Sequence, residues 1–424
     1  MQKENLNINI ESPTILNYPG SKKRLLDFIT NTVQKYGKKG ATILDIFAGT
    51  HAVGYALKND YKILANDAEI YSFIIGKCLL ENYSEFNFAR IENQFRLLYE
   101  NNLTLLQKNF PEYEEENNIL NRGDKDALVN FNHKIKTIWQ DGYKNRFSDN
   151  TIFHLFSTYY SNTYFGLNQS MQIDSIRYSI DQFNNSNIFY ILLTCLYFAM
   201  KECVFSKDGH MAQPLSVEKK ADVLLKKRNK SIFDIFITKL HSFETGEVIW
   251  SSFGKNHVYN MPVSELLKKE IIDNCDIIYA DPPYTDMQYS RYYHILETIT
   301  RYDYPAITHQ HGRCSTGLYR EHRFQSPLSQ HGKARYCIEE LIKFSKEKKK
   351  TIIFSYAYPR DIEKQKSNRY TVSIEELKSI FHKYYGIDAT YVEKEPFSHC
   401  NNSNSEMKKV FEYLIIGVPD GRNL

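Results

Sequence analysis

The sequence predicts an α/β protein with a doubly wound parallel sheet that is interrupted by a largely helical insert. Short apolar runs that end near an acidic residue or a turn recur along the chain, and helical patterns lie between them. Such alternation is typical of a parallel sheet with helices on both faces. It stops near residue 85 and resumes near residue 246, and polar, amphipathic and aromatic stretches fill the interval.

The sheet is predicted from five apolar segments, each short enough for a buried strand. They are Thr42–Phe47, Lys62–Asp67, Asp276–Asp281, Thr351–Tyr356 and Glu412–Gly417. Helical patterns lie between them, for example Tyr71–Leu80 and Arg335–Lys346. The first three segments carry an acid at or near their carboxyl ends, and this edge of an open parallel sheet is where ligands bind.

The insert is predicted from a change of pattern. Its segments are two amphipathic stretches, an aromatic and Asn-rich stretch, a buried helix and a basic stretch: Phe86–Phe110, Asp124–Lys144, Tyr159–Ser179, Ile188–Val204 and Lys219–Lys230. We therefore expect two domains, one formed by residues 1–84 and 246–424 and the other by residues 85–245.

Composition limits the class of protein. The chain has 424 residues, of which 42% are hydrophobic and 25% charged, as in ordinary globular proteins. A net charge of +4 is compatible with an anionic partner but does not require one. The seven cysteines form no CxxC pair, which argues against a zinc ribbon and fits reduced thiols in the cytoplasm. No apolar run reaches the roughly 20 residues of a membrane span, so no membrane association is expected.

The strongest chemical signal is Asp281-Pro282-Pro283-Tyr284, at the carboxyl end of a predicted strand. An exocyclic amine is a poor nucleophile because its lone pair is delocalised into the ring. A carboxylate and fixed main-chain carbonyls can accept its N–H hydrogens and localise that lone pair, and the prolines fix the backbone. The Tyr ring offers a face to a base. The alternative is a turn in which Asp281 caps a helix.

Two further signals point to a small charged ligand. The loop Asn17–Lys22, with Tyr18, Gly20 and Lys22, enters a predicted helix and can hold a charged molecule, although it can also be a plain turn. Asp45, Phe47 and Gly49 form a strand and small-residue turn, and Asp67 ends the next strand. This arrangement suits an adenosine ribose, although both acids can also be solvated strand ends.

The three signals, in this order, resemble the Dam-like adenine-specific DNA methyltransferases. That family has a Gly-Lys loop, an FxGxG-type turn, an acidic pair such as Asn66-Asp67, a target-recognition insert and a DPPY tetrapeptide. Asn162–Gly166 is similar to its aromatic-Asn-Gly segment, with Tyr-Phe-Gly in place of Phe-Asn-Gly, and Ser398–Ile416 is similar to its last strand. His51 stands where the family expects Gly, so either the backbone approaches the cofactor less closely or the imidazole contributes a contact.

The resemblance implies a Rossmann-like enzyme that transfers a methyl group from S-adenosyl-L-methionine to the N6 amine of adenine in double-stranded DNA. Residues 85–245 would be its target-recognition domain. The implied catalytic residues are Asp281, Pro282, Pro283 and Tyr284, and no metal is implied. The implied cofactor contacts are Tyr18, Gly20, Lys22, Asp45, Phe47, Gly49, Asp67 and Asp281. A restriction-modification or phage-defence role follows, which leaves open a separate restriction endonuclease as a partner.

Basic residues near the tetrapeptide suggest DNA contacts. Between His309 and Arg335 there are five Lys or Arg against one acid, and we expect Arg313, Arg320 and Arg323 to hold phosphates beside the active site. The alternative is a solvated loop. Arg291 either braces a phosphate or pairs with Glu297 on a helix.

The basic stretch of the insert is equally well a solvated helix face or a phosphate contact. Two other functions stay open for the whole chain. One is an RNA or protein amine methyltransferase, since DPPY-like tetrapeptides also serve those reactions. The other is a catalytically silent DNA-binding protein on the same fold, against which the presence of Asp67, Asp281 and Tyr284 argues.

Overall fold

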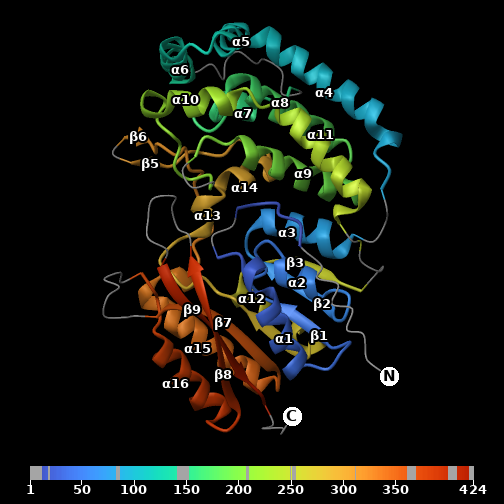
Figure 1. Ribbon diagram of the computed structural model, residues 1–424, viewed down its shortest axis with the longest axis vertical. Helices are drawn as coiled ribbons and strands as arrows, with labels where there is room; N and C mark the ends of the chain where they lie inside the picture. The colour runs from blue at the N-terminus through green and yellow to red at the C-terminus, as the bar shows by residue number, and fades with distance from the viewer. Residues whose placement is uncertain are drawn as a thin grey trace.

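The computed structural model describes residues 12–17, 20–82, 86–140, 152–206, 210–248, 250, 255–310, 312–360, 369–399 and 408–419. Figure 1 shows two parts. The sheet and its flanking helices form the lower part, and the helices of the insert form the upper part. No helix in the described ranges is long and apolar enough to cross a membrane.

The strands are β1 (Thr42–Asp45), β2 (Lys62–Asp67), β3 (His257–Asn260), β4 (Ile277–Ala280), β5 (His309–Gln310), β6 (Arg313–Cys314), β7 (Thr351–Pro359), β8 (Thr390–His399) and β9 (Lys408–Gly417). The helices of the lower part are α1 (Leu26–Tyr36), α2 (Ala52–Leu57), α3 (Ile70–Gly76), α12 (Val263–Leu266), α15 (His331–Glu347) and α16 (Ile374–Tyr385). Short helical turns are η1 (Lys22–Leu25), η2 (Lys77–Glu81), η5 (Phe243–Glu247), η6 (Glu270–Asn274) and η7 (Pro327–Ser329).

The helices of the upper part are α4 (Ala89–Asn109), α5 (Glu112–Arg122), α6 (Lys125–Gln140), α7 (Leu155–Tyr159), α8 (Leu167–Asp181), α9 (Ile188–Cys203), α10 (Val217–Arg228) and α11 (Ile232–Ser242). Two more, α13 (Tyr289–Tyr292) and α14 (His294–Arg301), follow the tetrapeptide.

The seven-stranded sheet has the order β3-β2-β1-β4-β7-β9-β8. The first five strands are parallel neighbours, and β9 pairs antiparallel with both β7 and β8. The predicted α/β class with a doubly wound, Rossmann-like sheet is confirmed. The prediction missed β3 and β8, because both are edge strands with polar residues in place of a continuous apolar run.

Successive residues of the central strands are buried on opposite faces of the sheet. In β1, Ile43 belongs to the core that contains α1 and α2, whereas Leu44 belongs to the core that contains α15 and α16. A strand covered on both faces has no polar side to present, which explains why these strands appear in the sequence as unbroken apolar runs. The first core continues from the sheet into α8, α9 and α11 of the upper part.

The chain that follows the tetrapeptide returns to the upper part. Tyr302 Oη donates a hydrogen bond to Asp174 Oδ1 (2.6 Å), Arg177 Nε donates to the carbonyl of Ile299 (3.1 Å), and Tyr164 Oη donates to the carbonyl of Gly317 (2.9 Å). Helix α14 and the segment around Gly317 therefore pack on the insert, although they come from the stretch 246–424. The predicted boundaries at 85 and 245 stay a prediction.

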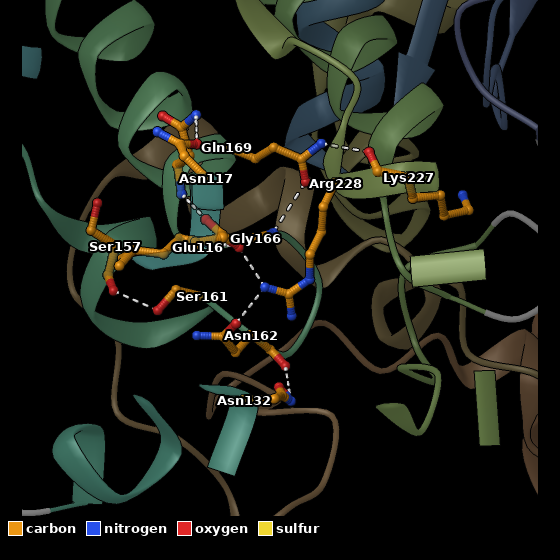
Figure 2. A network of polar contacts seen from close by, with 12 residues as sticks. Glu116, Asn117, Asn132, Ser157, Ser161, Asn162, Gly166, Gln169, Lys227 and Arg228 are labelled. Carbon is orange, nitrogen blue, oxygen red and sulfur yellow. Dashed lines mark hydrogen bonds and ion pairs between the residues drawn. The ribbon is translucent and has the colours of Figure 1, made fainter. Parts of the chain in front are cut away.

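A buried polar network fixes the insert (Figure 2). Arg228 Nη1 lies 2.5 Å from Glu116 Oε1 and donates to Asn162 Oδ1 (2.7 Å). The Glu116 carboxylate also accepts the amides of Leu167 (3.1 Å) and Asn168 (2.8 Å), at the start of α8. The network thus joins α5, α10 and the turn before α8.

The basic stretch of the insert, Lys219–Lys230, is therefore not exposed along its whole length. The Arg228 side chain is fully buried in this network, and the half-buried Lys227 donates its ammonium to the carbonyl of Val204 (2.7 Å). Neither side chain is available for a DNA phosphate in this conformation.

Candidate active site

One pocket opens at the carboxyl ends of β1, β2 and β4. The predicted residues that line it are Gly20, Lys22, Asp45, Phe47, Gly49, Asp67, Asp281, Pro282, Pro283 and Tyr284. The structure thus brings together three motifs that are far apart in the sequence. Tyr18 lies outside the described residues.

Asp281 follows β4 directly, and its side chain is 17% exposed. Its Oδ1 lies 2.9 Å from the Lys22 ammonium. Burial raises the pKa of Asp281 to about 7, the Lys22 charge counteracts this rise, and the charge of Glu412 adds to it. A carboxyl group with this pKa changes charge near neutrality.

Lys22, at the start of η1, lies between two carboxylates. Its Nζ is 2.9 Å from Asp281 Oδ1 and 2.9 Å from Glu412 Oε1. Burial acts to lower the pKa of Lys22, but the charges of Asp281 and Glu412 outweigh it and hold the pKa well above its ordinary value. The ammonium is therefore charged and forms an ion pair with Asp281, the predicted catalytic aspartate.

The ends of β1 and β2 carry the acids predicted to hold a cofactor. Asp67 accepts the amides of Gly49 (2.8 Å) and Glu69 (2.9 Å). Burial raises the pKa of Asp67, and these two amides oppose the rise. Asp45 Oδ1 is buried without a hydrogen-bond partner in the described part of the chain. Burial, followed by the charges of Asp281 and Asp67, raises the pKa of Asp45 well above its usual range.

The ionisable side chains of the pocket wall are mostly acids. Four acids line it, Asp45, Asp67, Glu69 and Asp281, against a single basic side chain among the described lining residues, Lys22. Buried charges need a partner of opposite sign. The pocket therefore suits a ligand that carries positive charge.

Aromatic rings form another wall of the pocket. The ring of Tyr284 is nearly parallel to that of Tyr370, with centroids 6.1 Å apart and planes inclined by 17°. Gly20 has φ +85°, and a Cβ at this position would lie 3.2 Å from Tyr289 Oη. A side chain here would therefore be strained and crowded, which explains the glycine in the loop.

His51, at the position where the resemblance predicts glycine, has a left-handed backbone conformation with φ +62°. Its ring is buried behind the loop, where Nε2 lies 2.8 Å from the Ser72 carbonyl, and burial lowers its pKa to about 4. Thr50 and Ala52 are among the described residues that line the pocket, and His51 is not. The imidazole is therefore a neutral packing group in this structure, behind the residues that line the pocket.

The predicted DNA-contacting arginines differ in their surroundings. Arg320 is 8% exposed, and its Nη1 and Nη2 bind the Asp303 carboxylate at 3.1 and 2.7 Å, so it is committed to an internal ion pair. Arg313 is exposed on β6. Arg291 and Arg323 both contact the Tyr319 ring, with guanidinium carbons 5.3 and 5.1 Å from its centroid.

The structure also shows the partner of Arg291 and the position of the basic segment relative to the pocket. Glu297 pairs with Arg301 at 2.9 Å, and Arg291 instead donates to Tyr319 Oη at 3.3 Å, so the alternative Arg291–Glu297 pair does not occur. Phe324, Ser326, Pro327 and Leu328 line the pocket, so this part of the basic segment lies beside the site as expected.

Sequence reasoning missed several residues of the site. Glu69 and Phe324 line the pocket, and so does the segment Met261–Ser264 that follows β3. The segment Met261–Ser264 was missed because it follows β3, a strand that the sequence did not predict. Glu412 gave one signal that could have been used, because it is an acid inside an otherwise apolar run at the start of a predicted strand.

Comparison with known proteins agrees with this geometry. Residues 18–130 match the family model of the D12 class N6 adenine-specific DNA methyltransferases. The chain is 26% identical over 413 residues to the type II methyltransferase M.FokI of Planomicrobium okeanokoites, covering 94% of this chain and 52% of that protein. It is 25% identical over 398 residues to the modification methylase LlaI of Lactococcus lactis subsp. lactis, covering 93% and 53%.

The type II methyltransferase M.NlaIII of Neisseria lactamica is 23% identical over 412 residues, and here the match covers 95% of this chain and 98% of that protein. The chain spans about half the length of the two longer relatives. The resemblance predicted from the motifs is confirmed: the chain is similar to the D12 class, or Dam-like, N6 adenine-specific DNA methyltransferases.

Proposed function

We propose that this chain transfers a methyl group from S-adenosylmethionine to the N6 amine of adenine in double-stranded DNA. The observation that carries the proposal is the acid-rich pocket that joins the ends of β1 and β2 to Asp281 and Tyr284. A site of this kind can hold a cation and a planar base next to each other. The names of the relatives support a modification reaction on DNA.

The residues present fit S-adenosylmethionine, which when bound supplies a methyl group on a positively charged sulfur. The unpartnered Oδ1 of Asp45 and the excess of carboxylates favour a cationic ligand. Each oxygen of Asp67 accepts one backbone amide and keeps a lone pair for a ribose hydroxyl. Phe47 and Ala48 provide apolar wall for the adenosine.

The amine is activated by the tetrapeptide. Asp281 Oδ1 is held by Lys22, which leaves Oδ2 to accept an N–H of the target amine. Accepting that hydrogen pulls the nitrogen toward a tetrahedral geometry and stabilises the positive charge that develops on it. Pro282 and Pro283 have no amide hydrogens, so the backbone here presents only acceptors. The ring of Tyr284 stacks on the adenine, which reaches the pocket by flipping out of the duplex.

The duplex is held by basic side chains near the pocket. We assign phosphate contacts to Arg291, Arg313 and Arg323, and we leave out Arg320 because Asp303 already neutralises it. Residues 85–245, together with the segment after the tetrapeptide that packs on them, would choose the target sequence. The biological context would be restriction-modification, with a separate endonuclease as the second component.

The test is the modification state of DNA in a living host. Genomic DNA from cells that express the chain is sequenced by a method that reports modified bases, in parallel with cells that express Asp281→Asn. We expect N6-methyladenine in one sequence context with the wild-type chain and none with the variant. Unmodified DNA together with methylated RNA or protein would favour the other amine methyltransferases, and no methylation at all would favour a silent DNA-binding protein.

A further inference from the structure

Glu412 occupies an unusual position for an acid. It lies in β9, between the parallel part of the sheet and β8, and its side chain is 0% exposed. Ser355 on the adjacent strand β7 donates its hydroxyl to Glu412 Oε1 (2.6 Å), and Lys22 Nζ lies 2.9 Å from the same oxygen. A charged group deep in a sheet is costly unless its partners are well placed. A position this costly is a candidate for function.

The partner of Glu412 is shared with the tetrapeptide. Lys22 is equidistant from Glu412 Oε1 and Asp281 Oδ1, at 2.9 Å from each. The three charges come from η1, β9 and the end of β4, which are distant in the sequence. One ammonium and two carboxylates leave one negative charge in the cluster.

We propose that Glu412 is a positioning residue, which anchors the Lys22 ammonium beside Asp281 and shares its charge, so that Asp281 stays a strong acceptor for the target amine. The proposal rests on the methyl transfer proposed above. If Glu412 were neutral, the whole charge of Lys22 would act on Asp281. The carboxylate would then hold its electrons more tightly and accept the amine hydrogen less well.

The other charged and titratable groups around this cluster are few. Those that face Asp281 or Glu412 are Lys22, Asp45, Tyr279, Tyr284, Tyr289 and Tyr370. The pKa values of the four tyrosines are raised, mainly by burial, so these groups are neutral between pH 5 and 9. Lys22 keeps its charge over that range, and Asp45 is common to the wild type and the variant. A change in the ionisation of Asp281 therefore reports on Glu412.

The test is Glu412→Gln, which preserves the shape of the side chain and an oxygen that can accept from Lys22 and Ser355. Removing a like charge at this range should lower the pKa of Asp281 by roughly one unit. The acidic limb of the pH profile of kcat/KM should therefore move about one pH unit toward lower pH. The rate on the alkaline plateau should fall about three- to tenfold, because a less basic carboxylate is a weaker acceptor.

The matched control is Glu393→Gln on the neighbouring strand β8, where the carboxylate binds Lys35 (2.6 Å) and Thr32 (3.0 Å) away from the pocket. It should leave both the limb and the plateau unchanged. If Glu412→Gln does not fold, Glu412→Met has a similar length and brings no polar atom of its own into the sheet, and the same shift is expected. A loss of rate at every pH with the limb in place, or a limb that moves toward higher pH, would overturn the proposal.

A second measurement separates this proposal from the proposed function. Carboxyl carbon NMR of aspartate-labelled protein, with the Asp281 signal assigned by Asp281→Asn, follows the titration without any turnover. We expect the midpoint to fall in Glu412→Gln even if the wild-type chain methylates no DNA. An unchanged midpoint would overturn the role of Glu412 whatever the enzyme acts on.

Discussion

The chain contains two buried charge clusters that are built differently. In the insert, one guanidinium, Arg228, meets one carboxylate, Glu116, and the carboxylate also accepts two backbone amides. In the pocket, one ammonium, Lys22, faces the two carboxylates of Asp281 and Glu412. The charges of the first cluster cancel within the protein, whereas the second keeps an excess negative charge.

This difference separates an interaction that maintains the fold from one that is completed by a ligand. A balanced buried pair, whose carboxylate also accepts two backbone amides, holds α5, α10 and α8 together. An unbalanced cluster of three charged groups next to the unpartnered oxygen of Asp45 is costly in isolation, and a bound cation would offset that cost. We therefore expect mutations in the insert cluster to change stability and mutations in the pocket cluster to change catalysis.

The largest effect is expected in the insert. Glu116→Ala leaves Arg228 buried without its counterion and removes the acceptor of two amides, which should lower the free energy of unfolding by about 3–5 kcal/mol. Denaturant melts measure this change. The neighbouring Glu115→Ala removes only an exposed pair with Lys134 and should cost no more than about 1 kcal/mol. Equal effects of the two substitutions would remove the distinction between the clusters.

The opposite result is expected for Asp281→Asn. The rate constant kcat should fall about 10²–10³-fold, as for other preorganised groups at a reacting centre, while the unfolding midpoint is maintained. Single-turnover methylation and a thermal melt of the same preparation measure both quantities. Asp286→Asn, a nearby exposed acid, serves as the control. Turnover within a few-fold of wild type would show that the amine is activated by another group.

The pocket cluster should also respond to pH. The pKa of Asp281 is raised to about 7, and the ionised form is the one that accepts the amine hydrogen. The value of kcat/KM measured at subsaturating cofactor should therefore be constant above this pH. It should fall about tenfold for each pH unit below it. A profile that stays flat down to pH 5 would show that Asp281 is already ionised there.

The smallest effect is expected for the surface arginines. Each phosphate contact contributes about 0.9 to the slope of log affinity against log salt, so Arg313→Gln with Arg323→Gln should flatten that slope by about 2. Cognate and random duplexes should lose affinity alike, because phosphate contacts do not read sequence. Arg320→Gln is the comparison, and it should destabilise the protein with little change in slope. An unchanged slope in the double variant would show that these side chains are only solvated.

The sequence predicted the central part of the fold and most of the pocket, because both depend on short local patterns. Apolar runs mark strands buried on two faces, and the acids at their ends converge on one edge, as Asp45, Asp67 and Asp281 do. The parts that it missed depend on long-range pairing. Strands β3 and β8 are defined by neighbours and not by an apolar run, and the partner of Lys22 is 390 positions away.

The sequence also did not predict which basic side chains are neutralised by acids inside the protein. Arg320 and Arg228 both belong to basic stretches that suggest DNA contacts. Asp303 and Glu116 neutralise them inside the protein. His51 fills the space beside Gly76, a contact between the turn before α2 and the end of α3 that no local pattern indicates.

The most direct test of methyl transfer by this pocket uses purified components. The chain is incubated with double-stranded DNA and S-adenosylmethionine labelled in its methyl group, and the DNA is digested to nucleosides for mass spectrometry. We expect the label in N6-methyl-2′-deoxyadenosine with the wild-type chain. We expect no label in this nucleoside with Asp281→Asn. Label in a cytosine, label only in added RNA or protein, or no label in any of them would contradict adenine methylation of duplex DNA.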